Sequence, residues 1–321
     1  MMPKVAETEV PELVVAILNW NGYDLTRSCL ISALRLAATT FRILVVDNGS
    51  AEPEAQRLAG EFGVQVEALA LPGNLGVGGG YNAAIRWARD CGAKYVLLLN
   101  NDTIVDDPML ARRLIDACGA DVFAVGPMVM EANGRLFSAG GKLSWRTSQT
   151  GHRQAGEITS PGSPYPVTWI DGSCLLVSVA AACELRGFDE DFFLYWEEVD
   201  VCVRAWRQGL RCLIEPRAAI VHLGSQTARS SQIDHLMLRN AILFMRRNGT
   251  KRQNAAFLMH LFCWRIPRFV AGRVKHGGAI RETVGMVLRS VAWNIRDAAR
   301  ERGWRRRAGG SLDCRGEGEG L

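Results

Sequence analysis

Four short runs of Val, Leu and Ile recur in the first hundred residues, separated by stretches in which polar and apolar residues mix. The runs cover residues 13–19, 42–48, 66–71 and 95–101. Near-continuous hydrophobicity over such short lengths is typical of strands that are buried on both faces, as in a parallel sheet. The pattern therefore predicts four parallel strands in this half of the chain.

Amphipathic stretches predict helices over residues 23–37, 81–93 and 107–119. In the last of these, Asp107 is placed to cap the helix, Pro108 lies in its first turn and Gly119 ends it. Strands that alternate with helices predict a doubly wound α/β sheet, whose ligands bind at the carboxyl ends of the strands. Unusual polar residues follow three of the four runs at that end: Asn19 and Asn21, Asp47 and Asn48, and Asn100, Asn101 and Asp102.

The second half of the chain continues with strands and then changes to helices. We expect a catalytic domain over residues 1–230, a basic helical region over 231–308 and a disordered tail over 309–321. Residues 137–166 are rich in Gly, Ser and Pro, which predicts a loop over a site. The other expected elements are strands at 122–130, 169–178, 211–216 and 218–224, and helices at 179–187, 197–209 and beyond about residue 230.

Charge is divided unequally along the chain. Residues 246–321 carry 17 Lys and Arg against 6 Asp and Glu, whereas residues 1–245 carry 21 against 27. Basic residues interleaved with aromatic ones on helices favour binding to an anionic membrane surface. The alternative is ordinary packing of these helices on the catalytic domain or between the protomers of a homo-oligomer. No nucleic-acid-binding module is recognisable, so nucleic acid is not an expected partner.

The cysteines and the N-terminus bear on the compartment. The nine cysteines are odd in number, never form a C-x-x-C pair and mostly fall in apolar segments. They are expected to be buried thiols in a reducing compartment. The N-terminus has no apolar signal region, and no apolar run reaches the length of about 18–20 residues that a membrane span needs. We therefore expect a cytoplasmic protein, peripheral at the inner face of the cell membrane if the basic helices bind there.

Asp102 is the sharpest polar feature of the first half. It emerges after a buried run, beside Asn100 and Asn101. One carboxylate together with substrate phosphates is a common way to hold Mg²⁺ or Mn²⁺, because these hard ions keep water ligands and take diphosphate oxygens. Asp106 and Asp107 are better placed than Asp102 to cap the following helix, which favours a metal-binding role for Asp102.

The glycine-rich residues 71–82 permit the backbone to approach a phosphate or a sugar closely. They contain neither a complete dinucleotide-binding fingerprint nor a P-loop lysine, and the turn after the first run supplies one glycine only, which excludes a dehydrogenase. A plain strand–helix connection is the alternative. Asp47 also suits a simple turn, and His222, after an apolar run, also suits simple packing.

The stretch FFLYWEEVD, residues 192–200, leads five apolar or aromatic residues into Glu197, Glu198 and Asp200. It predicts either the acidic start of a helix or a site with a perturbed carboxylate. On a helix, Glu197, Asp200 and Arg204 share a face and can pair with one another. Glu198 lies about 100° around from Glu197, on a different face.

Seven segments in order resemble the family 2 glycosyltransferases with the A-type nucleotide-sugar fold, particularly the bacterial rhamnosyltransferase-like branch. They span about residues 13–227 and read VVAILNWNG, ILVVDNGS, LPGNLGVGGGYN, YVLLLNNDT, DGSCLLVS, GFDEDFFLYWEEVDVCVRAWRQG and AIVHLGSQT. The resemblance implies that fold with a C-terminal helical appendage, an inverting transfer reaction and a bound Mg²⁺ or Mn²⁺.

The resemblance also implies roles for individual residues. Asp102 would be the metal-binding end of an aspartate-any-aspartate motif whose first carboxylate is replaced here by Asn100, and His222 would be a metal or diphosphate ligand. Glu198 would be the catalytic base, although relatives usually have Glu-Asp where this chain has Glu197–Glu198. Donor-binding roles are expected for Asn19, Asn21, Asp47, Asn74, Gly79, Asn82 and Asn101, and acceptor-side roles for Asp171, Gly172, Trp196 and Glu197.

The expected function is therefore transfer of a sugar, with rhamnose as the candidate, from a nucleotide-diphosphate sugar. The acceptor would be a hydroxyl group of a glycan or a polyprenyl-linked molecule in the synthesis of cell-surface polysaccharide. One alternative is a catalytically inactive, regulatory protein that binds a nucleotide sugar. The other is a nucleotidyltransferase, which should show a basic glycine-rich loop near the first strand; residues 19–27, NWNGYDLTR, are not such a loop.

Overall fold

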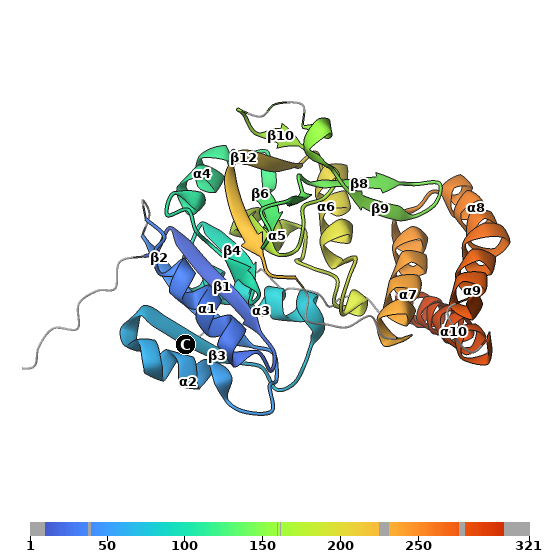
Figure 1. Cartoon of the computed structure of the whole chain (residues 1–321), viewed down its shortest axis with the longest axis horizontal. Coiled ribbons are helices and arrows are strands. Elements are labelled where there is room, and N and C mark those ends of the chain that lie inside the picture. The colour runs from blue at the N-terminus through green and yellow to red at the C-terminus, as the bar shows by residue number, and fades with distance from the viewer. Residues whose placement is uncertain are drawn as a thin grey trace, which may run out of the picture.

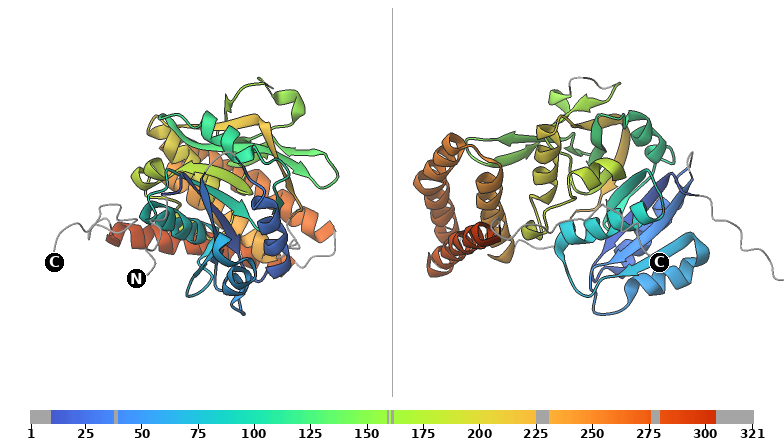
Figure 2. Two further views of the ribbon diagram at one scale, coloured as in Figure 1. Left: turned by 90° about the vertical axis from the view of Figure 1, so that its left-hand side faces the viewer. Right: turned by 180° about the vertical axis from the view of Figure 1, so that it is seen from behind.

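The computed structural model describes residues 10–37, 40–158, 160, 162–224, 231–275 and 280–304. A twisted sheet with helices on both faces forms the larger part, and a group of helices coloured orange to red lies at one end of it (Figure 1). The right-hand view of Figure 2 shows the same arrangement from behind. The doubly wound sheet and the C-terminal helices that the sequence predicts are therefore confirmed.

The first four predicted strands form one parallel set in the order β4-β1-β2-β3. Alternate residues of each strand point to opposite faces, so that Val14 and Ala16 belong to one hydrophobic core, and Val15 and Ile17 to the other. Burial on both faces explains the continuous hydrophobic runs of β1, β2 and β4. The expectation is wrong for β3, which lies at the edge of the sheet and buries only Val66. The strands are β1 (Leu13–Asn19), β2 (Phe41–Asp47), β3 (Val66–Ala70) and β4 (Tyr95–Asn100).

Helices cover both faces of this sheet. Helices α1, α2 and α4 pack on one core, and α3, α5 and α6 on the other. Helix α2 is not among the predicted helices, and α3 begins at Gly76, so the glycine-rich stretch forms its first turns rather than a loop before it. The bounds are α1 (Tyr23–Ala33), α2 (Glu54–Phe62), α3 (Gly76–Asp90), α4 (Leu110–Ala117), α5 (Val179–Glu184) and α6 (Glu197–Arg207).

The second half of the sheet adds strands in the order β10-β12-β6-β11, with β11 antiparallel between β6 and β4. Residues 211–222 form one strand with an irregularity between Glu215 and Ala219, where the sequence predicts two strands. The strands are β6 (Val122–Glu131), β10 (Tyr165–Pro166), β11 (Cys174–Ser178) and β12 (Arg211–His222).

The predicted loop over residues 137–166 contains regular structure. Strand β7 (Leu136–Ser138) pairs with β6, and β8 (Gly141–Ser144) and β9 (Gln149–His152) form a hairpin. The hairpin extends toward the C-terminal helices (Figure 1), and Trp145 near its tip stacks on Phe244 with 5.6 Å between the ring centroids. The hairpin thus links the sheet to the helices.

The C-terminal helices share a core with the sheet. Leu238, Ala241 and Phe244 belong to the same hydrophobic cluster as Val14 and Tyr81. None of the helices in the described residues is both long and apolar enough to cross a bilayer. Residues 305–321, with the predicted disordered tail, lie outside the described residues. The helical segments are α7 (Ser231–Asn248), α8 (Lys251–His260), a π-helical turn (Leu261–Arg265), α9 (Ile266–Lys275) and α10 (Ile280–Trp304).

Candidate active site

Asp102 and His222 meet although 120 residues separate them in sequence. The two-residue strand β5 (Thr103–Ile104) follows Asp102 and pairs with the end of β12, with His222 opposite Thr103. This places Nε2 of His222 3.1 Å from Oδ2 of Asp102. Burial lowers the pKa of His222, but the hydrogen bond and charge of Asp102 outweigh that effect, so the pKa is raised above its ordinary value.

The second carboxylate oxygen of Asp102, Oδ1, is buried and has no hydrogen-bond partner. A buried anionic oxygen without a partner is costly, and a divalent cation would relieve that cost. The described residues contain no group of three or more His, Cys, Asp or Glu side chains that could hold a metal. Asp102 therefore fits a cation whose remaining ligands are substrate oxygens and water. The metal- or diphosphate-binding role expected for His222, whose Nε2 contacts Asp102, stays a prediction.

Glu197 and Glu198 open helix α6, directly after the aromatic residues. Glu197 is only 5% exposed and its Oε2 has no hydrogen-bond partner. Burial raises the pKa of Glu197 to about 7. Burial and the neighbouring charge of Glu197 also hold the pKa of Glu198 well above its ordinary value. The raised pKa values agree with the perturbed carboxylate that the aromatic flank predicts, and they extend to both glutamates.

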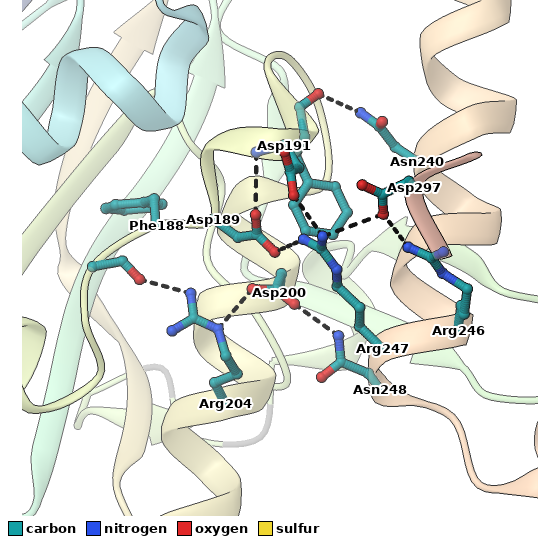
Figure 3. Close-up of polar contacts among 12 residues, drawn as sticks. Phe188, Asp189, Asp191, Asp200, Arg204, Asn240, Arg246, Arg247, Asn248 and Asp297 are labelled. Atoms are coloured by element: carbon teal, nitrogen blue, oxygen red, sulfur yellow. Dashed lines mark hydrogen bonds and ion pairs between the residues drawn. The ribbon is translucent and has the colours of Figure 1, made fainter. Parts of the chain in front are cut away.

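The expected pairing among three charged residues of α6 is correct for two of them and wrong for Glu197. Arg204 donates from Nε to Oδ2 of Asp200 at 2.7 Å, and Asn248 donates to Oδ1 of Asp200 at 2.7 Å (Figure 3). Glu197 lies in the first turn against α3, within ordinary contact distance of the place where Gly78 would carry a Cβ. Glu197 therefore packs against α3 and does not join the Asp200–Arg204 pair.

Asp171 and Gly172 lie in the turn before β11. Oδ1 of Asp171 accepts hydrogen bonds from the backbone and hydroxyl of Ser173, and Oδ2 lies 3.8 Å from Nδ1 of His152. A Cβ built on Gly172 would meet no atom within 4 Å, so this turn borders open space. The space is consistent with the acceptor-side role expected for both residues, which stays a prediction.

A hollow of about 340 Å³ adjoins His152. The ring of Phe137, which lines it, lies 4.6 Å from the ring of His152 and 6.2 Å from that of His222, centroid to centroid. The hollow therefore lies close to the Asp102–His222 pair. Its other lining residues are Glu131, Arg135, Leu136 and Gln154.

The polar residues at the ends of β1 and β2 form hydrogen bonds within and between the two loops that follow these strands. Asp47 accepts hydrogen bonds from the backbone of Ser50 at 2.8 Å and of Ala55 at 3.4 Å. Asn19 is fully buried, and its amide is engaged with Thr26, Ser50 and Glu54. Asn21 accepts from the backbone of Ala51 at 2.9 Å. These bonds fix the loops at the donor side, and direct contact of Asn19, Asn21 or Asp47 with a donor stays a prediction.

The glycine-rich segment is held by amide side chains. Asn48 donates to the carbonyl of Gly76 and accepts from the backbone of Leu75, both at 3.0 Å, and Asn74 accepts from the backbone of Gly76 at 2.9 Å. Asn48 is not among the predicted site residues. Its position directly after Asp47, at a strand end, could have indicated that it belongs to the site.

Three other predicted site residues are buried within the protein or held by its side chains. Asn82 binds the backbone of Phe188 through both amide atoms, at 2.8 and 2.9 Å, and Gly79 is buried within α3. Asn101 donates to the hydroxyl of Thr26 at 3.1 Å. These contacts give Asn82 and Asn101 structural tasks, and contact of the three residues with a donor stays a prediction.

Trp196 packs inward and not toward open space. It is 3% exposed, and its ring lies 5.1 Å from that of Phe244 in α7, centroid to centroid. Its expected acceptor-side role stays a prediction. Tyr81, which the sequence did not single out, joins the site instead: its hydroxyl lies 2.8 Å from Oδ1 of Asn100 and 2.9 Å from the carbonyl oxygen of Gly172. The signal for Tyr81 was its place directly after the glycine run.

Comparison with known proteins gives consistent matches. Residues 14–160 match the family model for glycosyl transferase family 2. The N-acetylglucosaminyl-diphospho-decaprenol L-rhamnosyltransferase of Mycobacterium tuberculosis is 28% identical over 249 residues, which cover 70% of this chain and 79% of that protein.

Two solved structures show the same fold at low identity. GalNAc-T7 with UDP, GalNAc and Mn²⁺ superposes with a TM-score of 0.60 at 13% identity, covering 75% of this chain and 48% of that chain. The mannosyltransferase PcManGT of Pyrobaculum calidifontis, in complex with GDP-Man and Mn²⁺, superposes with a TM-score of 0.54 at 14% identity, covering 90% and 81%.

Proposed function

The chain belongs to glycosyl transferase family 2, and on that premise we propose that it is an inverting, metal-dependent glycosyltransferase. The donor is a nucleotide-diphosphate sugar, with L-rhamnose as the candidate sugar. The acceptor is a hydroxyl group of a glycan or a polyprenyl-linked molecule in the synthesis of cell-surface polysaccharide. The rhamnosyltransferase of M. tuberculosis, whose name includes a decaprenol-linked diphosphate, supports the choice of sugar and acceptor.

One observation carries this proposal. A carboxylate with a buried, unpartnered oxygen, Asp102, stands beside His222, and a pair of carboxyls with raised pKa values, Glu197 and Glu198, opens α6. Burial and the charges of Glu197, Glu198 and Asp102 all raise the pKa of Tyr81, so both groups act electrostatically on the same side chain. Transfer of a sugar needs both: a place for the diphosphate and a base for the acceptor.

Glu198 acts as the base. It takes the proton of the acceptor hydroxyl as that oxygen attacks the anomeric carbon on the side opposite the departing diphosphate, and this displacement inverts the configuration. Glu198 is half-buried, whereas Glu197 is almost fully covered, so Glu198 is the carboxyl that an acceptor can reach. A raised pKa gives the carboxylate useful basicity near neutral pH.

Asp102 would hold the divalent cation through its unpartnered oxygen, and His222 beside it would be a further metal or diphosphate ligand. When bound, Mg²⁺ or Mn²⁺ supplies positive charge that stabilises the leaving diphosphate. The residues that orient the donor are those that fix the neighbouring loops: Asp47 and Asn21 after the first two strands, and Asn48 and Asn74 at the glycine-rich start of α3.

The C-terminal helices place the enzyme on an anionic membrane surface, where a polyprenyl-linked acceptor resides. Phe262 and Trp264 of the π-helical turn are exposed, and the guanidinium of Arg268 lies 5.2 Å from the ring centroid of Trp264. Aromatic and basic groups together suit the boundary between lipid headgroups and acyl chains. Other exposed apolar residues of this region are Leu258, Met259, Ile280, Val284, Leu288 and Ile295. The alternative is that these exposed apolar residues contact the same helices of a second protomer in a homo-oligomer.

The proposal is tested by transfer assays with purified protein. UDP- and dTDP-linked rhamnose, UDP-GlcNAc and GDP-mannose are each offered with a polyprenyl-diphosphate sugar acceptor, with Mn²⁺, with Mg²⁺ and with excess chelator. We expect metal-dependent transfer from one donor and, by NMR of the product, an inverted anomeric configuration. A product of retained configuration, or no transfer from any donor, would overturn the proposal.

A further inference from the structure

The loop that leads into Glu197 has an unusual backbone. Phe193, Tyr195 and Trp196 have φ angles of 64°, 69° and 79°, in the left-handed region that residues with a side chain rarely adopt. Each such residue costs of the order of 1–3 kcal/mol and persists only where the surroundings impose it. Something must therefore hold residues 191–196, which run from within the 3₁₀ turn Glu190–Phe192 to the start of α6.

Two adjacent residues of α7 hold this loop. Nδ2 of Asn240 lies 2.9 Å from the carbonyl oxygen of Phe192 and 2.8 Å from those of Leu194 and Tyr195. Nη2 of Arg239 donates to the carbonyl of Phe192 at 2.6 Å and to that of Asp191 at 2.7 Å. The loop carbonyls thus converge on α7.

The two side chains also fix each other. Nε of Arg239 donates to Oδ1 of Asn240 at 2.7 Å, which leaves the amide nitrogen of Asn240 to face the loop. Asn240 is fully buried and Arg239 is 8% exposed, so water cannot replace these donors. Buried donors in a complete network hold one arrangement firmly.

The same loop supports the donor side of the site. The carbonyl of Phe193 accepts from the backbone of Val77 at 2.7 Å, at the glycine-rich start of α3. Gly76 approaches so closely that a built Cβ would lie 2.2 Å from that carbonyl oxygen. The loop therefore determines where Glu197 and Glu198 stand relative to the segment expected to meet the donor.

A second set of contacts ties the neighbouring acidic residues to the end of α7 (Figure 3). Arg247 forms ion pairs with Asp189 and Asp191, the second at 2.5 Å, and Asn248 donates to Asp200 within α6. These contacts fix both ends of the segment that contains the strained loop.

We propose that Arg239 and Asn240 are positioning residues for the transfer reaction, which hold loop 191–196 in its left-handed backbone and thereby aim the carboxylate of Glu198 at the acceptor. The inference rests on the proposed function for the reaction itself. It makes α7 part of the catalytic apparatus and not an appendage.

The test compares Asn240→Ala with Asn294→Ala. Asn294 is also buried and also binds α7, through the carbonyl of Arg239 at 3.0 Å, but no hydrogen bond joins it to the loop. We expect Asn240→Ala to lower kcat by about 10²-fold, since a displacement of about 1 Å has effects of that size, with the donor KM changed by no more than about threefold. Asn294→Ala should lower the melting temperature by a similar amount and leave kcat within about threefold of wild type.

Hydrogen exchange separates this inference from the proposed function. The amides of residues 193–200 should exchange faster in Asn240→Ala than in wild type or Asn294→Ala, and this result needs no substrate. Arg239→Lys keeps the positive charge and loses the paired guanidinium donors, so its kcat should fall between those of wild type and Asn240→Ala. This variant replaces Asn240→Ala in the test if Asn240→Ala does not fold.

The inference is overturned if the loop amides of Asn240→Ala exchange as slowly as those of wild type. It is also overturned if kcat falls in proportion to melting temperature in Asn240→Ala, Asn294→Ala and Arg239→Lys alike. Wild-type protein without transfer activity overturns the proposed function instead.

Discussion

The imidazole of His222 contacts one carboxylate oxygen of Asp102 at 3.1 Å, while the other oxygen of Asp102 is buried without a partner. The pair is formed because β5 and the end of β12 run side by side. The histidine therefore orients the aspartate and leaves its second oxygen for a ligand.

From this pair we predict the response of donor binding to metal. Asp102→Ala should abolish the part of nucleotide-sugar affinity that depends on Mn²⁺ or Mg²⁺, because the buried anionic oxygen is lost. Calorimetric titration of the nucleotide sugar with and without metal measures this affinity. Asp106→Ala, which removes an exposed aspartate nearby, is the matched control. Full activity of wild-type protein in excess chelator would sink the idea.

The two glutamates of α6 should respond differently to substitution. Glu198→Gln keeps the shape and removes the base, so turnover should fall by roughly 10²–10⁴-fold with donor affinity nearly unchanged. Glu197→Gln should act mainly on stability, because Glu197 is the more deeply buried of the two. If Glu198→Gln turns over normally while Glu197→Gln, Asp171→Asn or Asp200→Asn is inactive, the base has been assigned to the wrong carboxylate.

Stability should depend on pH through Glu197. Its pKa rises from the ordinary 4.5 to about 7 on burial. The folded protein therefore keeps a proton that the unfolded chain releases in this window, and the free energy of unfolding falls as pH rises from 4.5 to about 7. Thermal melts at about pH 5 and about pH 8 should show a smaller loss for Glu197→Gln than for wild type. An equal loss of melting temperature in wild type and Glu197→Gln would contradict this prediction. So would a loss in the exposed control Glu52→Gln that is reduced as much as in Glu197→Gln.

Gly76 should not tolerate a side chain. Its φ is +75°, and a Cβ would lie 2.2 Å from the carbonyl oxygen of Phe193. Gly76→Ala should cost at least about 1–2 kcal/mol of stability from the backbone alone and should also impair donor binding. Gly60→Ala in α2, where a Cβ would meet nothing within 4 Å, is the control and should be stabilising by about 0.5–1 kcal/mol. Chemical denaturation of both variants measures the difference; equal behaviour would contradict the close approach.

Binding to lipid should depend on the π-helical turn. Full-length protein should float with anionic liposomes at low salt and less so at high salt. The double substitution Phe262→Ser and Trp264→Ser should reduce flotation, whereas Trp206→Ser, an exposed tryptophan of α6, should not. Wild-type protein that ignores anionic liposomes at low salt would show that these helices serve another contact.

The strands β1, β2 and β4 and the placing of Asp102 at a strand end could be predicted because burial on both faces leaves a continuous hydrophobic run. Strand β3 was also predicted, although it is an edge strand that buries only Val66. The start of α3 could not be predicted, since its first five residues include four glycines and have low helix propensity. The close approach of Leu18 to Gly80 and of Phe193 to Gly76 is a tertiary contact that the local sequence does not show. The nine-residue helix α2 was missed because it buries only Ala55 and Leu58.

Long-range contacts within the site left no local pattern. The two-residue strand β5 is too short to show periodicity, yet it brings His222 to Asp102. Asn240 is a single amide within a helix, and nothing near it in sequence indicates that it binds the carbonyls of a loop more than forty residues earlier. Such contacts are set by tertiary packing, which spacing along the chain does not encode.

The left-handed backbone at Phe193, Tyr195 and Trp196 has a consequence for protein engineering. A redesign that selects residues for backbone compatibility would place glycine at these positions, where glycine relieves about 1–2 kcal/mol of strain per residue. Such a variant would lose Trp196 from the core and gain freedom in the loop that carries the carboxylates. Thermostabilising libraries for this enzyme should therefore keep residues 192–200 fixed and spend their diversity on surfaces remote from α6 and α7.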